Sequence, residues 1–256
     1  MFPIGDDNHD RTTFPIITIG LIVINVLVFF GLQGGGGNAN FTNAFSTVPA
    51  EILTGNDIVT DDRVVVFQTD YGTEQSFPVP GLRPTPVHVY LTLLTAMFMH
   101  GSIAHLGGNM WFLWIFGDNI EHDFGRIRYL LFYLACGLLA SLAHVVLNSN
   151  DASPSYLTPS LGASGAISGV MGAYLILHAN RRVTVFLFRF LMDVPGWVAV
   201  GIWFLFQVIN GLGMLGGRGD GVAYGAHIGG FLAGMLLSQL FPKLARDTLG
   251  TGSQTW

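Results

Sequence analysis

Residues 14–32 read FPIITIGLIVINVLVFFGL, a run of nineteen residues without a charged side chain. A helix needs roughly 20 apolar residues to cross the hydrocarbon core of a bilayer. The run is longer than a signal-peptide core, and no small-residue cleavage pattern follows it closely. We therefore expect a retained membrane anchor.

Five further apolar segments follow this run, at about 98–117, 127–148, 162–180, 195–214 and 221–241. Half of the chain is hydrophobic and only 11% is charged, with a mean hydropathy of +0.52. Soluble domains usually carry about a quarter charged residues. The sequence therefore predicts an all-α membrane protein, a six-transmembrane-helix bundle over residues 14–241. An N-terminal segment, 1–13, and a C-terminal tail, 242–256, lie outside it.

A single long loop, about 33–97, joins the first two predicted spans. It opens with four glycines, carries several acidic residues and ends in a proline cluster. Its stretch VVVFQT (64–69) has the composition of a short strand or an interfacial segment. We expect a solvated connector, or an element that shapes access to a site.

The basic residues predict the orientation. With six spans, eight of the eleven Lys and Arg residues fall on the side that holds both termini. The positive-inside rule then puts both termini in the cytoplasm. We expect a multi-pass integral protein, in the plasma (inner) membrane if the source is prokaryotic. The net charge of −5 and the lack of a basic cluster argue against nucleic-acid binding. The lone Cys136 excludes an intramolecular disulfide and a cysteine-based metal site.

Four polar residues fall at similar depth in three predicted spans. His105 and Asn109 are one helical turn apart near the start of the second span, Ser164 opens the fourth, and His227 lies about six residues into the sixth. All three spans begin on the non-cytoplasmic side. At about 1.5 Å per residue, the four side chains lie within roughly 5–15 Å of that surface.

This cluster suits acyl transfer. A serine hydroxyl needs an adjacent base to become a good nucleophile, and a neutral histidine can serve. The Asn109 amide, the His105 imidazole and the Ser164 backbone N–H are the available donors for an oxyanion. Small residues spaced three or four apart let two helices approach closely, and both helices concerned carry them: Gly165, Gly169 and Gly172 on one, Ala226, Gly230 and Gly234 on the other. Each feature alone has an ordinary packing explanation.

At these residues the sequence resembles the rhomboid family of intramembrane serine proteases. The resemblance rests on HGSIAHLGGN (100–109), GASG (162–165) and AHIGGFLAG (226–234), in the order found in the family, and covers roughly residues 90–241. It implies a rhomboid-like bundle with Ser164 as nucleophile and His227 as base. It also implies oxyanion stabilisation by His105, Asn109 and the Ser164 N–H, with Gly162 shaping the loop before the nucleophile.

Two positions depart from the family pattern. Leu91 and Thr92 stand where members often carry Trp-Arg, so the long loop needs a different anchor. Ser168 stands four residues after the nucleophile, where an aromatic residue often packs on the base. Support for the imidazole must then come from elsewhere, and Tyr224 is a candidate.

The predicted function is that of a serine endopeptidase without metal or other cofactor. It would cleave transmembrane segments of single-pass proteins in the lipid bilayer, near the non-cytoplasmic surface, through a Ser–His dyad and an acyl-enzyme. A zinc enzyme would need an H-E-x-x-H pattern, which Glu121-His122-Asp123, expected in a loop, does not provide. An aspartyl enzyme would need two acids within spans, whereas Asp118 and Asp193 are expected at span ends. An inactive rhomboid-like protein that binds membrane clients, and a small transporter, are the remaining alternatives.

Overall fold

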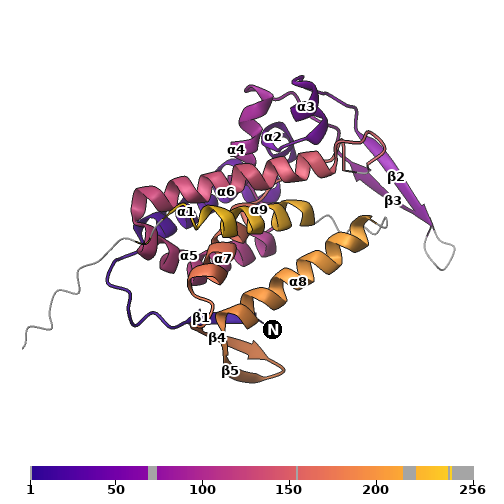
Figure 1. The fold of residues 1–256 in the computed structure, drawn as a ribbon. Coiled ribbons are helices and arrows are strands. Elements are labelled where there is room, and N and C mark those ends of the chain that lie inside the picture. The colour runs from indigo at the N-terminus through magenta and orange to yellow at the C-terminus, as the bar shows by residue number, and fades with distance from the viewer. Residues whose placement is uncertain (1, 69–73, 154, 216–222, 242, 244–256) are drawn as a thin grey trace, which may run out of the picture.

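A computed structural model describes residues 2–68, 74–153, 155–215, 223–241 and 243. Its main body is a bundle of apolar helices (Figure 1). The helices of this bundle are α1 (Ile16–Leu27, continued by a π-helical turn over Val28–Leu32), α5 (Ile103–Phe124), α6 (Arg126–Leu147), α7 (Ser164–Leu177), α8 (Gly196–Leu215) and α9 (Tyr224–Leu237). Helix α7 is buried along most of its length and packs against α5, α6, α8 and α9.

The helix lengths support part of the predicted membrane topology. Among the described residues, α6 alone is long and apolar enough to cross a bilayer by itself. The segment Val89–Phe98 and α5 meet the same test together, across a bend of 78°. The apolar stretches of the other four helices are shorter, so the number of six spans stays a prediction.

The second predicted span begins and ends later than expected. The segment 98–117 was expected, but α5 starts at Ile103 because the chain bends before it and the Ser102 side chain caps the new helix by accepting the His105 N–H at 3.1 Å. Glu121-His122-Asp123 therefore lie in the last turns of α5, not in a loop. Asp118 lies inside the same helix, not at its end.

Glu121, in the last turns of α5, links this helix to the start of α1. Its carboxylate is buried and accepts the backbone N–H groups of Ile17 at 2.9 Å and Thr18 at 2.8 Å, together with the Thr18 hydroxyl at 2.8 Å. The first N–H groups of a helix lack partners and carry partial positive charge. The last turns of α5 thus cap the start of α1 and tie the two helices together.

The expectation of an all-α protein is wrong in detail, because two small sheets accompany the bundle. One is antiparallel with the order β1-β4-β5, from β1 (Phe2–Asp6), β4 (Arg182–Leu187) and β5 (Phe190–Pro195). Asp193 lies in β5 and not at a span end. The other sheet is a hairpin of β2 (Arg63–Gln68) and β3 (Glu74–Val79), which confirms the strand that VVVFQT suggested.

The loop 33–97 is folded and docks beside the bundle. It contains the short helices α2 (Ala39–Phe45), α3 (Pro49–Thr54) and α4 (Thr92–Thr95) besides the β2–β3 hairpin. Thr47 and Ser160 exchange both backbone hydrogen bonds, at 3.0 and 2.8 Å. The loop therefore supports the segment that leads into α7, and is more than a solvated connector.

Helices α7 and α9 touch through their backbones, as their small residues predict. A Cβ added to Gly230 would lie 2.1 Å from the Gly165 carbonyl oxygen, and one added to Gly234 would lie 1.9 Å from that of Gly169. Any side chain at these places would push the helices apart. The contact brings the starts of α7 and α9 together.

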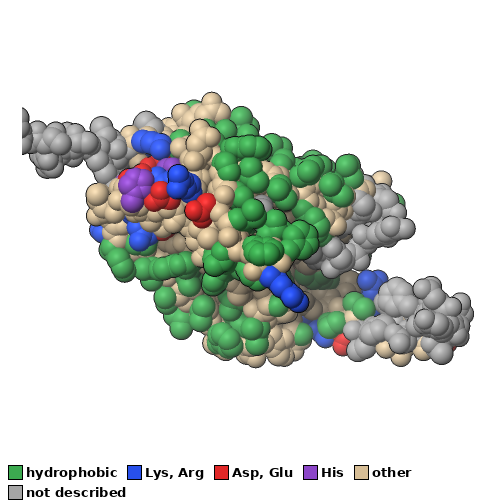
Figure 2. Space-filling view, turned by 90° about the horizontal axis from the view of Figure 1, so that it is seen from below, with side chains coloured by type: hydrophobic (Ala, Val, Ile, Leu, Met, Phe, Trp, Pro, Cys, Tyr) green, Lys and Arg blue, Asp and Glu red, His purple; other side chains and the backbone are tan. Residues whose placement is uncertain are grey.

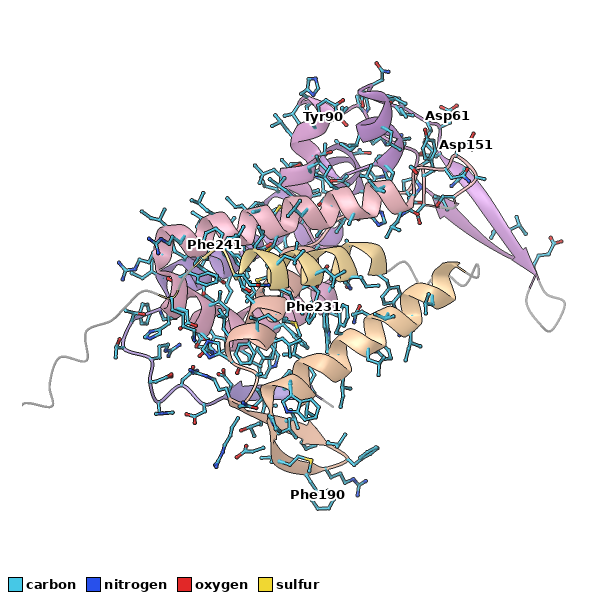
Figure 3. All side chains as sticks on the ribbon, viewed as in Figure 1. Asp61, Tyr90, Asp151, Phe190, Phe231 and Phe241 are labelled. Atoms are coloured by element: carbon cyan, nitrogen blue, oxygen red, sulfur yellow. The ribbon has the colours of Figure 1, made fainter. Side chains whose placement is uncertain are left out.

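The outer surface fits a lipid environment. Hydrophobic side chains cover much of the face in Figure 2, and many charged and histidine side chains in that view gather at its left end. Figure 3 shows Phe190 pointing away from the bundle at the β4–β5 hairpin, whereas Phe231 lies between α9 and α8 and stacks on Phe204 at 4.1 Å. Large exposed hydrophobic residues line α8: Ile202, Leu205, Phe206, Ile209 and Leu212.

Candidate active site

The structure brings Ser164 and His227 together. Ser164 is the first residue of α7 and His227 is the fourth of α9, so the close contact between these helices sets their separation. The Ser164 Oγ lies 2.7 Å from the His227 Nε2. This is hydrogen-bonding distance for a hydroxyl that donates to an imidazole.

Three side chains surround the His227 ring on its other sides. The Gln207 Oε1 of α8 lies 2.7 Å from His227 Nδ1. The Trp203 ring, also on α8, lies 6.2 Å from the imidazole at an angle of 34°, and the Tyr224 ring meets it edge-on at 6.2 Å. Tyr224 thus contacts the base as expected, and Trp203 contributes an aromatic face from a helix that the sequence did not suggest.

The donor side of the site is built by α5. The Gly101 backbone N–H donates to His105 Nδ1 at 3.4 Å, which leaves the ring proton on Nε2. That Nε2 faces Gly162, where an added Cβ would be 3.0 Å away. Asn109 is 7% exposed, and its Nδ2 finds no acceptor among the described residues. A buried amide donor without an acceptor is rare, and it suits an oxygen that arrives with a substrate.

Gly162 has the conformation that only glycine adopts easily. Its φ is +131°, and a Cβ there would crowd both the His105 ring and Ser164 Oγ, at 3.0 and 3.4 Å. Its backbone N–H donates to the Ala96 carbonyl at 2.9 Å. Gly162 therefore shapes the chain directly before Ser164 and leaves open space between Ser164 and His105.

A cavity of about 760 Å³ is lined by most of these side chains: His105, Asn109, Ser164, Trp203, Gln207 and His227. Its walls come from α5, α7, α8 and α9, with the segment 155–161 at its rim. Phe112 of α5 and Trp203 of α8 both line it, and their ring centroids are 6.3 Å apart. His144 of α6 also reaches it, 5% exposed. The cavity is large enough to hold several residues of an extended peptide.

The two departures from the family pattern have local explanations. The Ser168 hydroxyl turns back and donates to the Ser164 carbonyl at 2.6 Å, so the ring contact with His227 falls to Trp203 and Tyr224 instead. At the other departure, Thr92 is fully buried, and its carbonyl accepts the Thr47 hydroxyl at 2.9 Å. This buried contact joins the early part of the long loop to its last part.

Comparison with known proteins agrees with this geometry. The model of the Rhomboid domain matches residues 88–243, which are more than half of the chain. The chain belongs to the rhomboid family. It is therefore an integral membrane protein, in a family that includes intramembrane serine proteases.

Three relatives illustrate the match. This rhomboid is 30% identical over 220 residues to the rhomboid protease GluP of Bacillus subtilis (strain 168), which covers 86% of the chain and 34% of the relative. It is 32% identical over 155 residues to Rhomboid protein 1, mitochondrial, of Saccharomyces cerevisiae (strain ATCC 204508 / S288c). This match covers 60% of the chain and 42% of the relative. It is 35% identical over 166 residues to RHOMBOID-like protein 4 of Arabidopsis thaliana, a match that covers 62% of the chain and 35% of the relative. The matched segments are less than half of each relative.

The sequence did not single out three residues of this rhomboid site: Gln207, Trp203 and His144. Gln207 carried a usable signal, because it is a polar amide inside the otherwise apolar stretch VGIWFLFQVI (200–209). The reasoning that drew attention to intramembrane histidines applies to a buried amide as well. Nothing in the sequence alone shows which way its side chain points.

Proposed function

We propose that this rhomboid is an intramembrane serine endopeptidase that cleaves single-pass transmembrane proteins. The membrane domain is residues 14–241, with α1 and α5–α9 as its six spans and both termini in the cytoplasm. The basic-residue distribution supports this orientation. The names of the relatives include mitochondrial ones, so the choice of membrane follows the source of the chain. The tail 242–256 lies outside the described residues, apart from Lys243.

In the proposed reaction His227 Nε2 takes the proton of Ser164 Oγ as this oxygen attacks the scissile carbonyl carbon. The resulting imidazolium returns that proton to the leaving amine when the C–N bond breaks, which leaves an acyl-enzyme ester. Water then adds to the ester with His227 as base, and the acid product leaves with Ser164 restored. Serine, histidine, substrate and water supply every atom, so the reaction needs no cofactor.

The proposed oxyanion donors are His105 Nε2–H, Asn109 Nδ2 and the Ser164 backbone N–H. The unpartnered Asn109 amide supports this assignment. Ser164 is the first residue of α7, so its N–H has no acceptor within its own helix. Donors that are held in place before the reaction stabilise the developing charge without reorganisation.

The walls of the cavity favour a substrate that enters laterally between α5 and α8. Residues from both helices line it, and Phe112 and Trp203 are the aromatic contact that joins them. Water would enter at the rim formed by the segment 155–161. The predicted outer loop 215–220 lies almost wholly outside the described residues.

The 2.7 Å contact between Ser164 Oγ and His227 Nε2 is the observation that carries this proposal. The test is labelling by a fluorophosphonate, which reacts with activated serines. We expect the detergent-solubilised protein to be labelled, and Ser164→Ala and His227→Ala to lose both labelling and cleavage of a reconstituted transmembrane substrate. Unchanged thermal unfolding would show that the variants are folded.

Two results would contradict the proposal. A wild-type protein that is folded but neither labelled nor active would indicate an inactive rhomboid-like protein that binds membrane clients. Normal turnover by Ser164→Ala would exclude this nucleophile.

A further inference from the structure

We propose that Gln207 is a positioning residue for His227, and that its amide oxygen holds the imidazole in the tautomer that accepts the Ser164 proton. The inference rests on the proposed function, and it adds α8 to a site that the sequence assigned to a Ser–His dyad alone.

The geometry places Gln207 and Ser164 on the two nitrogens of one ring. Gln207 Oε1 lies 2.7 Å from Nδ1, and Ser164 Oγ lies 2.7 Å from Nε2. An amide oxygen only accepts hydrogen bonds, so Nδ1 must carry the proton. Nε2 is then the unprotonated nitrogen, as a base for the serine hydroxyl requires.

Without this acceptor, the imidazole of His227 could also adopt the tautomer that carries its proton on Nε2. With its proton on Nε2 the imidazole would donate toward Ser164 and could not take the hydroxyl proton. The Trp203 and Tyr224 ring centroids both lie 6.2 Å from that of His227, and these ring contacts restrict the position of the imidazole without choosing its tautomer. Gln207 is the described side chain that the structure places at hydrogen-bonding distance from Nδ1.

A neutral amide suits this place. Gln207 is 6% exposed on a helix whose other faces carry large exposed hydrophobic residues. An ionised side chain inside a membrane helix is costly, whereas a neutral amide is much less so. Glutamine orients the base as the carboxylate of a Ser-His-Asp triad does, without introducing a charge into the bundle.

Gln207 also links the base to the wall of the substrate cavity. Gln207 and Trp203 are one turn apart on the same face of α8, and both contact His227 and line the cavity. The alignment of the base therefore depends on the position of α8. The other titratable groups that face His227 from packed elements are His105 of α5, His144 of α6 and Tyr224 of its own helix.

The test compares Gln207→Leu, which removes the acceptor, with Gln207→Glu, which keeps it. Asn210→Leu is the matched control, because Asn210 is a partly buried amide on α8 that does not line the cavity and donates to the Phe206 carbonyl of its own helix. Each variant is measured in detergent for kcat and KM with a transmembrane substrate, and for kcat/KM as a function of pH.

We expect Gln207→Leu to lower kcat by about 10–100-fold with little change in KM, as is found when the hydrogen-bond partner of a metal-binding histidine is removed. Gln207→Glu should recover most of kcat at high pH. Its acidic limb should move to higher pH by about one unit or more, because a carboxylate at Nδ1 favours the imidazolium. Asn210→Leu should match the wild type. A merely structural role would predict neither the recovery nor the shift.

A second measurement does not depend on activity. The ¹⁵N shifts of the His227 ring nitrogens, assigned by comparison with His227→Ala, should report a protonated Nδ1 in the wild type and a mixture of tautomers in Gln207→Leu. Equal kcat for Gln207→Leu and wild type, or an unchanged tautomer, would overturn the proposal. An inactive wild type with this tautomer shift would refute the protease and keep the positioning role. If Gln207→Leu does not fold, the pH profile of Gln207→Glu decides, since an unmoved acidic limb would exclude contact with Nδ1.

Discussion

At the scale of single residues, the site contains a polar atom that has no partner among the described residues before a substrate binds. This atom is the Asn109 Nδ2, an amide donor buried in the cavity wall. Leaving such a donor unpaired costs free energy, about 1–3 kcal/mol. That cost is recovered when an oxyanion forms beside it, so the interaction favours the transition state over the resting enzyme.

Asn109→Ala should lower kcat/KM by about 10–1000-fold, as loss of one oxyanion donor does in other acyl-transfer enzymes. Its melting temperature should be equal to or above that of the wild type, because an unsatisfied buried group is removed. Cleavage assays and thermal unfolding measure the two effects. Asn25→Ala, which removes a buried amide on α1 that does not line the cavity, is the control for activity. Loss of activity in proportion to loss of stability would contradict an oxyanion role.

The sequence predicted much of the site at this scale. His105, Asn109, Ser164 and His227 meet in one cavity, as their equal depth in three helices implied. Gln207 and Trp203 were missed, because they reach the site only through the rotation of α8 about its axis. An apolar helix in lipid has no polar stripe that would predict this rotation.

At the scale of elements, the contact between α7 and α9 sets the distance between the two reacting groups. The backbone carbonyls of Gly165 and Gly169 occupy the space where side chains on α9 would lie. Because backbone atoms cannot change rotamer, a larger residue in this contact must separate the helices. The separation would be felt directly between Ser164 and His227.

Gly234→Leu should therefore abolish fluorophosphonate labelling and lower the melting temperature, with a loss of stability of about 1–3 kcal/mol or more from overpacking. Gly20→Leu is the matched control, because an added Cβ at that helical glycine of α1 has no atom within 4 Å. Labelling at several temperatures, beside thermal unfolding, separates lost alignment from lost folding. Normal labelling of Gly234→Leu would show that the contact does not set the distance.

Most helices were predictable, and the strands mostly were not. All of the predicted spans except the second agree with helices to within a few residues, because long apolar runs are a strong local signal. The pairing of β1 with β4 joins residues 2–6 to 183–186, with α1, α5, α6 and α7 between them in the sequence. No local pattern announces a contact between segments so distant in sequence.

At the scale of the whole molecule, β1 ties the N-terminal segment to three other elements. It pairs with β4, and the Trp111 indole of α5 donates to the Pro3 carbonyl at 2.7 Å. The Asp6 carboxylate accepts the Tyr174 hydroxyl at 2.8 Å and the Asn119 amide at 2.7 Å, which joins α7 to α5. Residues 2–6 of the N-terminal segment, which was expected to lie outside the membrane domain, are thus part of the folded structure.

Asp6→Ala should lower the melting temperature at every pH, since it leaves the Tyr174 and Asn119 donors buried without this acceptor, at a cost of about 1–3 kcal/mol. Asp6→Asn keeps an accepting oxygen and should have a smaller effect. Thermal unfolding of both variants in the same detergent measures the difference. Equal melting temperatures for wild type and Asp6→Ala would show that the strand contributes no stability.

The difference in stability between the wild type and Asp6→Asn should depend on pH. Burial raises the pKa of Asp6 above its ordinary value of 3.8, against the opposing effects of Tyr174, Arg181 and Asn119. The folded protein then holds this proton more tightly than the unfolded chain, so its stability falls as pH rises from about 4 through the raised pKa. Asp6→Asn should gain in melting temperature relative to wild type over that range. A difference in melting temperature between the two proteins that stays constant with pH would contradict a raised pKa for Asp6.

The glycine contact between α7 and α9 also makes the spacing of Ser164 and His227 independent of the side chains that face the lipid. Two main chains touching each other fix the spacing of nucleophile and base, while the outward side chains of both helices have no share in it. Bilayers of different thickness or fluidity act on those outward groups and on the helix ends. The reacting pair should accordingly keep its alignment across membranes that differ widely in composition.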